Sequence, residues 1–303
     1  MSSPTPLEQL HLALRGEQIN AQFCPWWSQL SLHAGMGRVL LAHPDTRAKL
    51  ETALRLAVSN GVSCRILGAG TNLVGSDSDC PDLAIRLSGH FREIAQTGAE
   101  FQVGAGLSLL QFLTFAARQG YGGLSALSGI PGTLGGAAAM NAGAMGVEFG
   151  PHLTALEGYT LDGRRWEMHP APQDWGYRQS PVPANVVVTM VTIRLKEVTA
   201  REELGLIKSE LQRRAKVTPK GHSAGSVFRN PSPEQPAGLL LEQAGCKNLQ
   251  RNNVLVSPQH ANWLVVQGDQ PAAAADCRWL YDEMRHRVQS RFGITLRSEW
   301  RWQ

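Results

Sequence analysis

Two glycine-rich stretches have the residue types and the spacing needed to bind phosphate groups. The longer run, residues 129–146 (GIPGTLGGAAAMNAGAMG), holds six glycines and five alanines, and its only side chains able to hydrogen-bond are Thr133 and Asn141. Glycine permits positive φ and a close approach of the backbone to a ligand. Successive N–H groups in such turns bind anions. The run therefore predicts a loop laid against a phosphate-bearing cofactor, with a tight packing loop as the alternative.

The shorter stretch, residues 68–75 (GAGTNLVG), follows residues 63–67, which are predicted to form a short buried strand. Leu73 stands where a dinucleotide-binding fingerprint requires its third glycine, and Ser76 stands where a P-loop requires lysine. Neither motif is therefore present. Two separate glycine loops predict a long ligand with two phosphates.

Four further motifs follow these loops in a set order. They are YRQS at 177–180, GSVFRNP at 225–231, AGLLLE at 237–242 and HANW at 260–263. In this order, from about residue 30 to the C-terminus, the chain resembles the UDP-N-acetylenolpyruvoylglucosamine reductases. The lengths between the motifs are similar to those of the shorter type in that family, which lacks an extra tyrosine-bearing loop.

The resemblance implies an α+β fold with two lobes, which are an FAD-binding domain of the vanillyl-alcohol-oxidase (PCMH) type and a C-terminal α+β substrate domain. It places an N-terminal segment at 1–29, the FAD-binding domain at 30–199 and the substrate-binding domain at 200–303. The implied enzyme is an NADPH- and FAD-dependent UDP-N-acetylmuramate dehydrogenase, which reduces the enolpyruvyl group of its UDP-sugar substrate during peptidoglycan synthesis. A flavin oxidase or a non-catalytic flavin-binding protein of the same fold is the alternative.

The resemblance assigns both glycine loops to FAD. Because neither loop contains His or Cys, we expect the cofactor to be held without a covalent bond. The expected cofactor-binding residues are Gly68, Ala69, Gly70, Thr71, Asn72, Leu73, Gly129, Ile130, Pro131, Gly132, Thr133, Gly135, Gly136, Ala137, Asn141 and Ala142.

Reduction of an enol ether beside a carboxylate needs a hydride at the β-carbon and a proton at the α-carbon. The protein should therefore supply a proton donor and groups that stabilise growing negative charge. The resemblance identifies Ser226 as the donor, and Arg178 and Glu299 as the stabilising groups. A turn serine bonded to its own backbone is the alternative for Ser226.

The resemblance also gives a set of substrate-binding residues: Tyr177, Lys216, Lys220, Arg229, Asn230 and Glu242. Either Lys216 or Lys220 meets the diphosphate or the nicotinamide cofactor, and the sequence leaves that choice open. The family usually has lysine at the position of Arg229. Other departures from its pattern are Met36, Ser125 and Val266.

Composition excludes several other classes of protein. The net charge of +4, from 29 basic and 25 acidic residues, is spread along the chain, so a nucleic-acid partner is not expected. The five cysteines form no C-x-x-C motif, so no metal site is expected. The N-terminus lacks the apolar core of a signal peptide, and no apolar run is long enough to span a membrane. We expect a cytoplasmic monomer whose partners are the UDP-sugar and NADPH.

Local patterns predict the main elements. Helices are expected at 44–60, 108–119, 201–216 and 272–292, with apolar residues at helical spacing and stops such as Gly61 and Gly120. Strands are expected at 82–87, 101–103, 185–195, 254–256 and 263–267. The first of these helices should bury Leu50, Leu54 and Ala57, and the last should bury Cys277, Leu280, Met284 and Val288.

Overall fold

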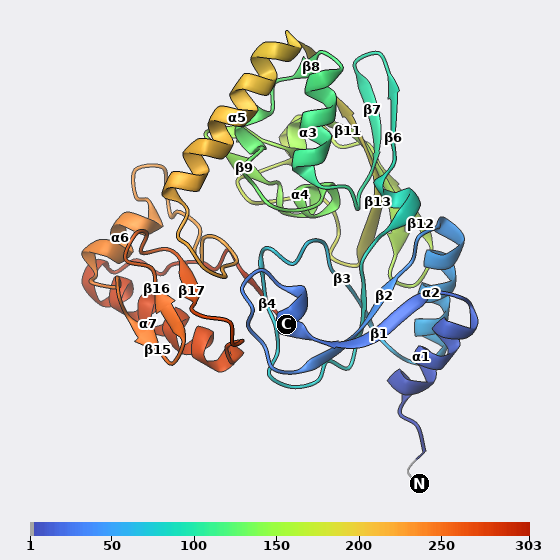
Figure 1. Ribbon diagram of the computed structural model, residues 1–303, viewed down its shortest axis with the longest axis horizontal. Helices are drawn as coiled ribbons and strands as arrows, with labels where there is room; N and C mark the ends of the chain where they lie inside the picture. Colours follow the sequence, from blue (N-terminus) through green and yellow to red (C-terminus); the bar gives the residue numbers. More distant parts are fainter. Residues whose placement is uncertain (1–2) are drawn as a thin grey trace. The chain divides into compact units, whose positions relative to one another are not determined.

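The structure is a computed structural model that describes residues 3–303. The chain forms two compact units. The first unit holds the described residues up to Gln22 together with residues 40–69 and 81–214, and the second holds residues 23–39, 70–80 and 215–303. Along residues 3–303 the chain changes unit five times: within β1 (Asn20–Pro25), β2 (Arg38–His43) and α5 (Ala200–Val217), between Ala69 and Gly70, and between Cys80 and Pro81. Figure 1 shows these elements along the chain.

The first unit contains a five-stranded antiparallel sheet of order β12-β11-β13-β7-β6. Its central strand, β13, is a valine-rich run that is buried along most of its length, because strands flank it on both sides and α4 contacts it. The strands are β6 (Ile94–Thr97), β7 (Glu100–Gly104), β11 (Leu153–Thr160), β12 (Arg165–Met168) and β13 (Val186–Arg194).

A second sheet has the strand order β1-β2-β5-β3. Most of its residues belong to the same unit. Strand β5 (Leu83–Ile85) pairs in parallel with β2 and with β3 (Cys64–Ile66). The strand predicted at 63–67 is confirmed as β3, but its predicted burial was wrong: β3 lies at the edge of the sheet, Cys64 and Arg65 are half-buried and Ile66 is 38% exposed.

Helices cover the sheets of this unit. Helix α2 is capped by Thr46 and buries Leu50, Leu54 and Ala57, as predicted. Ser108 occupies the N-cap of α3, but its side chain makes no capping hydrogen bond. The remaining elements of the unit are α1 (Pro6–Gly16), α2 (Arg47–Ser59), α3 (Leu109–Arg118), α4 (Leu134–Met140), β8 (Tyr121–Gly122), β9 (Gly143–Ala144), β10 (Val147–Glu148), β14 (Lys196–Glu197) and the short 3-10 helices η2 (Gly89–Arg92), η3 (Ser125–Leu127), η4 (Gly150–His152) and η5 (Pro172–Asp174).

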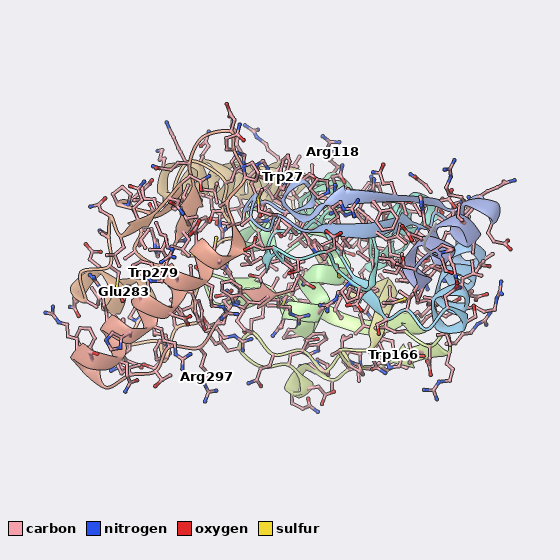
Figure 2. All side chains as sticks on the ribbon, turned by 90° about the horizontal axis from the view of Figure 1, so that it is seen from below. Trp27, Arg118, Trp166, Trp279, Glu283 and Arg297 are labelled. Carbon is pink, nitrogen blue, oxygen red and sulfur yellow. The ribbon has the colours of Figure 1, made fainter. Side chains whose placement is uncertain are left out.

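The second unit packs helices α6 (Ala237–Gln243) and α7 (Ala274–Phe292) with an antiparallel sheet of order β15-β16-β17. Its core includes Cys277, Leu280, Met284 and Val288, the predicted stripe of α7. On the other side of the helix Trp279 is 44% exposed, one turn from Glu283 (Figure 2). Its other elements are η1 (Trp26–Gln29), β4 (Leu73–Val74), β15 (Gln250–Arg251), β16 (Val254–Val256), β17 (Leu264–Val266) and β18 (Arg301–Trp302).

A parallel pair, β4 with β18, brings residues of the first glycine loop beside the C-terminus within the second unit. The functional boundary predicted near residue 200 falls at the start of α5, and the compact units divide after Arg214, inside that helix. The functional boundary stays a prediction. Within residues 3–303, no helix combines the length and apolar composition that a membrane crossing requires.

Candidate active site

The second glycine loop turns into helix α4. Thr133 is its N-cap and accepts a hydrogen bond from the Gly136 N–H through its hydroxyl, at 3.3 Å. Asn141 closes the helix in the left-handed conformation, with φ of 41°. Within the first unit this loop lies against the start of the other one, because a Cβ at Gly68 would be only 3.0 Å from Thr133 Oγ1.

Five backbone N–H groups in these neighbouring loops donate no hydrogen bond to any described residue. They belong to Gly68, Ala69, Gly129, Gly132 and Thr133. Unpaired backbone donors need an acceptor from solvent or from a ligand, and such donors gathered in turns suit phosphate oxygens. Next to Gly129, Ser128 is 2% exposed, and its hydroxyl has no partner among the described residues. These groups fit the diphosphate and polar atoms of a dinucleotide cofactor such as FAD.

Further along the first loop, glycine is needed for packing against protein. Gly70 has φ of 71°, and a Cβ there would lie 2.3 Å from the Gln29 carbonyl oxygen. A Cβ at Gly75 would lie 2.7 Å from the Ala34 oxygen. In this part of the loop, within the second unit, the packing alternative accounts for both glycines.

Arg178 lies in a tight turn beside the second glycine loop. Gly176 and Gln179 are paired across the turn, and Arg178 has φ of 54°, a region that side chains other than glycine and asparagine seldom adopt. Its guanidinium Nη2 donates to the Gly143 carbonyl oxygen at 2.9 Å, and its Cζ lies 5.2 Å from the centroid of the Tyr177 ring. The predicted residues Tyr177 and Arg178 therefore adjoin the predicted cofactor loop.

A second arginine at this loop, Arg214, was missed by the sequence analysis. It donates from Nη1 to the Gly129 carbonyl oxygen at 3.0 Å. Burial lowers the pKa of its guanidinium; the negative charge of Glu210 opposes that shift, while Arg213 and Arg178 add to it. Arg178 is thus near enough to repel Arg214, and two cations converge on one glycine loop. The sequence holds no signal that separates Arg214 from the more exposed Arg213, and both pair with Glu210, at 3.6 Å and 2.7 Å.

Ser226 and Glu299 are brought together in the second unit by strand-like pairing. The N–H of Glu299 donates to the Val227 carbonyl oxygen at 2.9 Å, and Phe228 pairs with Ser298. The predicted proton donor and the predicted glutamate therefore stand on adjacent backbone segments. Asn72 of the first glycine loop joins them, because its Nδ2 donates to the Glu299 carbonyl oxygen at 2.9 Å.

Arg229 and Arg301 form a cationic pair in the same unit. Arg229 extends the pairing by donating its N–H to the Arg297 oxygen at 2.9 Å. Its side-chain Nε is buried without a partner among the described residues. Burial lowers the pKa of Arg301, and the charge of Arg229 lowers it further. A buried guanidinium N–H with no acceptor suits an anionic ligand group, which fits the predicted substrate-binding role of Arg229. The sequence analysis did not single out Arg301, whose positive charge lies beside it.

The other predicted substrate-binding residues have varied surroundings. The Lys216 and Lys220 side chains are exposed, and their amines pair with no described residue. Asn230 Oδ1 accepts from the Ala237 N–H at 3.0 Å, which caps α6. Glu242 forms an ion pair with Lys247 at 2.6 Å. Asn230 and Glu242 thus each have a partner within the protein, and the two lysines are free to meet a ligand.

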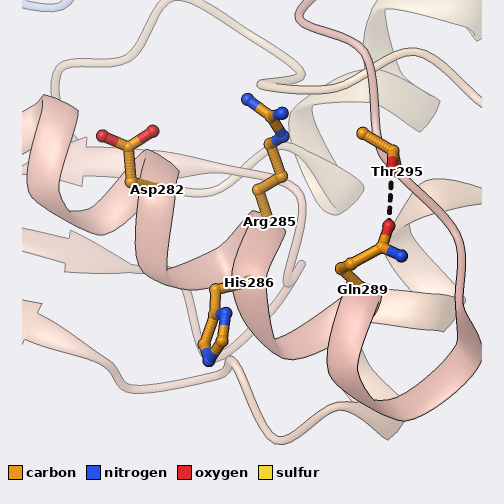
Figure 3. A pocket seen from close by; sticks show the side chains of 5 residues that line it. All are labelled: Asp282, Arg285, His286, Gln289 and Thr295. Atoms are coloured by element: carbon orange, nitrogen blue, oxygen red, sulfur yellow. Dashed lines mark hydrogen bonds between the residues drawn. The ribbon is translucent and has the colours of Figure 1, made fainter.

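A hollow of about 250 Å³ on α7 is separate from these residues (Figure 3). It is lined by Asp282, Arg285, His286, Gln289 and Thr295, none of which is a predicted site residue. Among residues 3–303, no cluster of three or more His, Cys, Asp or Glu side chains is arranged to hold a metal ion.

Comparison with known proteins gives two family matches. Residues 39–168 match an FAD binding domain, and residues 217–303 match the C-terminal domain of UDP-N-acetylenolpyruvoylglucosamine reductase. The UDP-N-acetylenolpyruvoylglucosamine reductase 2 of Symbiobacterium thermophilum is 37% identical over 255 residues, which cover 84% of this chain and 82% of the relative. The chain belongs to the UDP-N-acetylenolpyruvoylglucosamine reductase family.

A further relative and a solved structure support the same family assignment. The Myxococcus xanthus enzyme of the same description is 35% identical over 274 residues, which cover 89% of this chain and 87% of the relative. The crystal structure of the reductase (MurB) from Thermus caldophilus is 33% identical, with a TM-score of 0.79 over 94% of this chain and 99% of that one. The predicted family, the oxidoreductase class, the FAD cofactor and the α+β fold with an FAD-binding domain are confirmed.

Proposed function

We propose that this protein reduces the enolpyruvyl group of UDP-N-acetylenolpyruvoylglucosamine with electrons from NADPH, and so supplies UDP-N-acetylmuramate for peptidoglycan synthesis. Membership of the reductase family is the observation that carries the proposal. It is supported by the pairing of the Ser226 and Glu299 segments and by the two arginines at the second glycine loop.

In this proposal the glycine loops hold FAD without a covalent bond. Bound FAD supplies the chemistry of accepting a hydride from NADPH and passing it to the substrate. The unpaired N–H groups of the two loops donate to the diphosphate. The backbones of Gly129 and Gly143 are fixed by Arg214 and Arg178, whose guanidinium groups donate to their carbonyl oxygens.

The side chains proposed to act on the substrate have two roles, which are to stabilise negative charge and to donate a proton. Arg178 binds the carboxylate of the enolpyruvyl group through two N–H groups, so that charge growing there is stabilised. Ser226 donates the proton to the α-carbon, and Glu299 on the neighbouring segment orients a water molecule or donates a hydrogen bond. Tyr177, Arg229, Asn230, Glu242 and one of Lys216 and Lys220 are proposed to meet the sugar nucleotide.

Domain roles and cellular setting complete the proposal. The FAD-binding domain is taken as residues 30–199 and the substrate domain as residues 200–303. The enzyme is proposed to act as a monomer in the cytoplasm, where nucleotide sugars and NADPH are both available.

Anaerobic mixing tests the function directly. The flavin absorbance should bleach on addition of NADPH and return only when UDP-N-acetylenolpyruvoylglucosamine is added. Rapid recovery with oxygen and indifference to NADPH would identify an oxidase instead. A flavin that neither donor nor substrate alters would identify a binding protein without turnover. The flavin should also leave the acid-precipitated protein and colour the supernatant, and a yellow pellet would contradict non-covalent binding.

A further inference from the structure

Asn141 is the one polar side chain in the second glycine loop that is completely buried, with an exposed fraction of 0%. Its side chain joins three places in the first unit. Nδ2 donates to Glu148 Oε2 at 2.8 Å and to the Gly176 carbonyl oxygen at 2.8 Å. Oδ1 accepts from the Gly150 N–H at 2.9 Å. The amide therefore links the end of α4 to β10, η4 and the turn that carries Arg178.

These bonds leave the amide little capacity for a ligand. An asparagine side chain has two N–H donors and one carbonyl acceptor, and both donors are already used within the protein. Breaking either bond would leave a buried group unpaired, which costs about 1–3 kcal/mol. A hydrogen bond donated by this amide to FAD would require that loss. The Oδ1 atom keeps a second lone pair, but the side chain is 0% exposed. A role in holding the loop requires no such loss.

The bond to Gly176 bears directly on Arg178. Gly176 opens the turn, which is closed by the Gln179 N–H donating to the Gly176 oxygen at 2.8 Å and the Gly176 N–H donating to the Gln179 oxygen at 3.2 Å. Arg178 stands inside the turn with φ of 54°. A non-glycine residue in this region persists only where its surroundings hold it there.

Arg178 returns the contact to the same loop. Its Nη2 donates to the oxygen of Gly143, two residues after Asn141. The Asn141 side chain thus bonds to the turn at Gly176, and the Arg178 side chain of that turn bonds back to the loop at Gly143. The loop and the turn are therefore linked by two side-chain hydrogen bonds. The Arg178 guanidinium packs closely against Gly143, because a Cβ at Gly143 would lie 3.0 Å from Arg178 Nη1.

We propose that Asn141 is a positioning residue, which holds the Arg178 turn so that the guanidinium faces the substrate carboxylate. The inference rests on the proposed role of Arg178. It assigns Asn141 to the half-reaction in which the substrate is reduced, rather than to cofactor binding.

The test separates the side chain of Asn141 from its backbone. Asn141→Gly keeps access to the left-handed conformation but removes all three hydrogen bonds. Asn141→Asp keeps the shape but places a carboxylate oxygen against two acceptors, Glu148 Oε2 and the Gly176 oxygen. We expect substrate turnover to fall by up to about 10²-fold in the glycine variant and further in the aspartate variant. If only side-chain volume mattered, the aspartate variant would be the milder one.

Measuring the two half-reactions separately distinguishes a positioning role from a general structural role, because loss of structure would slow both. Flavin content and the rate of bleaching by NADPH should stay near wild type, while the rate of flavin reoxidation by the enolpyruvyl substrate falls. Asn252→Gly is the matched control, since Asn252 is also left-handed, with φ of 49°, and its amide also donates a side-chain hydrogen bond, to Asp276. It should leave both rates unchanged. Equal loss of both half-reactions in Asn141→Gly would overturn the proposal.

A double-variant cycle distinguishes this inference from the proposed function. If Asn141 acts through Arg178, adding Asn141→Gly to Arg178→Lys should cost little more than Arg178→Lys alone. Additive losses would show that the two act separately. Wild-type turnover in Arg178→Lys would reject the role of Arg178 itself, whereas a slow Arg178→Lys beside a normal Asn141→Gly would reject only the positioning role.

If Asn141→Gly does not fold, Gly143→Ala tests whether the position of the Arg178 guanidinium limits turnover. The new methyl would lie 3.0 Å from Arg178 Nη1, 3.1 Å from the Val147 oxygen and 3.3 Å from Glu148 Cγ. It removes no hydrogen-bonding group of the Asn141 amide and keeps the bond to the Gly176 oxygen available. Slower reoxidation with normal bleaching is expected. Unchanged reoxidation would show that the position of the guanidinium does not limit turnover, and would overturn the inference.

Discussion

Arg178 and Ser226, the two residues proposed to act on the enolpyruvyl group, are held in place by different means. A buried asparagine bonds to the backbone two residues from each of them: Asn141, 0% exposed, to Gly176, and Asn262, 3% exposed, to Phe228. Asn141 bonds to three separate segments of the first unit. Asn262, in the second unit, gives both of its amide bonds to Phe228, accepting from its N–H at 2.9 Å and donating to its oxygen at 2.8 Å.

The backbone around Ser226 is also paired on two sides. The Val227 N–H donates to the Asn262 carbonyl oxygen, and the Val227 oxygen accepts from the Glu299 N–H, both at 2.9 Å. At the Arg178 turn, side-chain bonds make the link to the glycine loop. Backbone pairing tolerates side-chain changes better than a link made of side chains does. We therefore expect substitutions beside Ser226 to change mainly the free energy of unfolding, and substitutions beside Arg178 to change mainly the rate of turnover.

Ser226→Ala should have the largest effect on turnover. Removing a positioned acid costs roughly 10²–10⁴-fold, and the loss should appear in reoxidation of the flavin by the substrate. Bleaching by NADPH needs no proton from this hydroxyl and should stay near wild type. Stopped-flow absorbance of the flavin follows both steps.

Ser226→Cys is the matched partner, because a thiol is a stronger acid than a hydroxyl and keeps a proton at this position. Partial recovery relative to alanine is expected. Loss of FAD from the alanine variant would instead identify Ser226 as a structural turn residue. Wild-type rates in both half-reactions would move the proton donor elsewhere, with Glu299 acting through water as the next candidate.

Arg178→Lys should come next, at about 10²-fold in turnover. Lysine keeps the charge but cannot form the second hydrogen bond to a carboxylate, and loss of one such contact in the transition state costs this much. The variant also loses the guanidinium that reaches the Gly143 oxygen. Arg194→Lys, at an exposed ion pair with Glu100, is the control and should keep full turnover.

How much of the fold could be predicted depended on whether the signal was local. Helices α2 and α7 were predictable because apolar residues recur at helical spacing and a glycine ends each pattern; Gly293 closes α7 with φ of 71°. Strand β3 was predicted at the right place, but its burial was misjudged because its position at the sheet edge is set by its neighbours. That residues 23–39 and 70–80 belong to the C-terminal unit rests on pairings as distant as β4 with β18, which no local pattern reveals.

The candidate site shows the same division. The glycine loops pointed to phosphate binding, and the unpaired N–H groups of Gly68, Ala69 and Thr133 fit that prediction. Sequence could not show that Gly70 and Gly75 are required by packing, since glycine serves a close protein contact and a close ligand contact equally well. Nor could it separate Arg214 from Arg213, because only tertiary packing turns one of them toward the loop.

Asn262→Ala tests the side of the comparison that concerns stability. It leaves the N–H and the oxygen of Phe228 without their amide partners, and Phe228 is 1% exposed. A buried unpaired group costs about 1–3 kcal/mol in the free energy of unfolding, which denaturant titration measures. Asn185→Ala, at an exposed position, should change it by less than about 0.5 kcal/mol. Normal stability with a lost proton-transfer step in Asn262→Ala would break the comparison.

The smallest effect expected is a pH dependence of stability through His260. Its Nδ1 accepts from the Asn262 N–H at 3.2 Å, so this nitrogen must be unprotonated. Burial lowers the pKa of the imidazole below its usual 6.5, and Lys247 lowers it further, although a backbone hydrogen bond and Glu242 oppose the shift. Between the folded pKa and 6.5 the unfolded chain binds more protons than the folded one, so stability rises with pH in this window.

His260 should therefore contribute fully above pH 6.5, and its contribution should fall as the pH drops through 6.5 toward the lowered folded pKa. His33, His43 and His152 also have pKa values lowered by burial and act in the same direction. A comparison of wild type with His260→Gln, which does not titrate, isolates the one group. The difference in the free energy of unfolding between the two should be constant at neutral pH and should shift in favour of the glutamine variant on acidification. Parallel pH curves would show that the bond between His260 and Asn262 is not what holds the Ser226 segment.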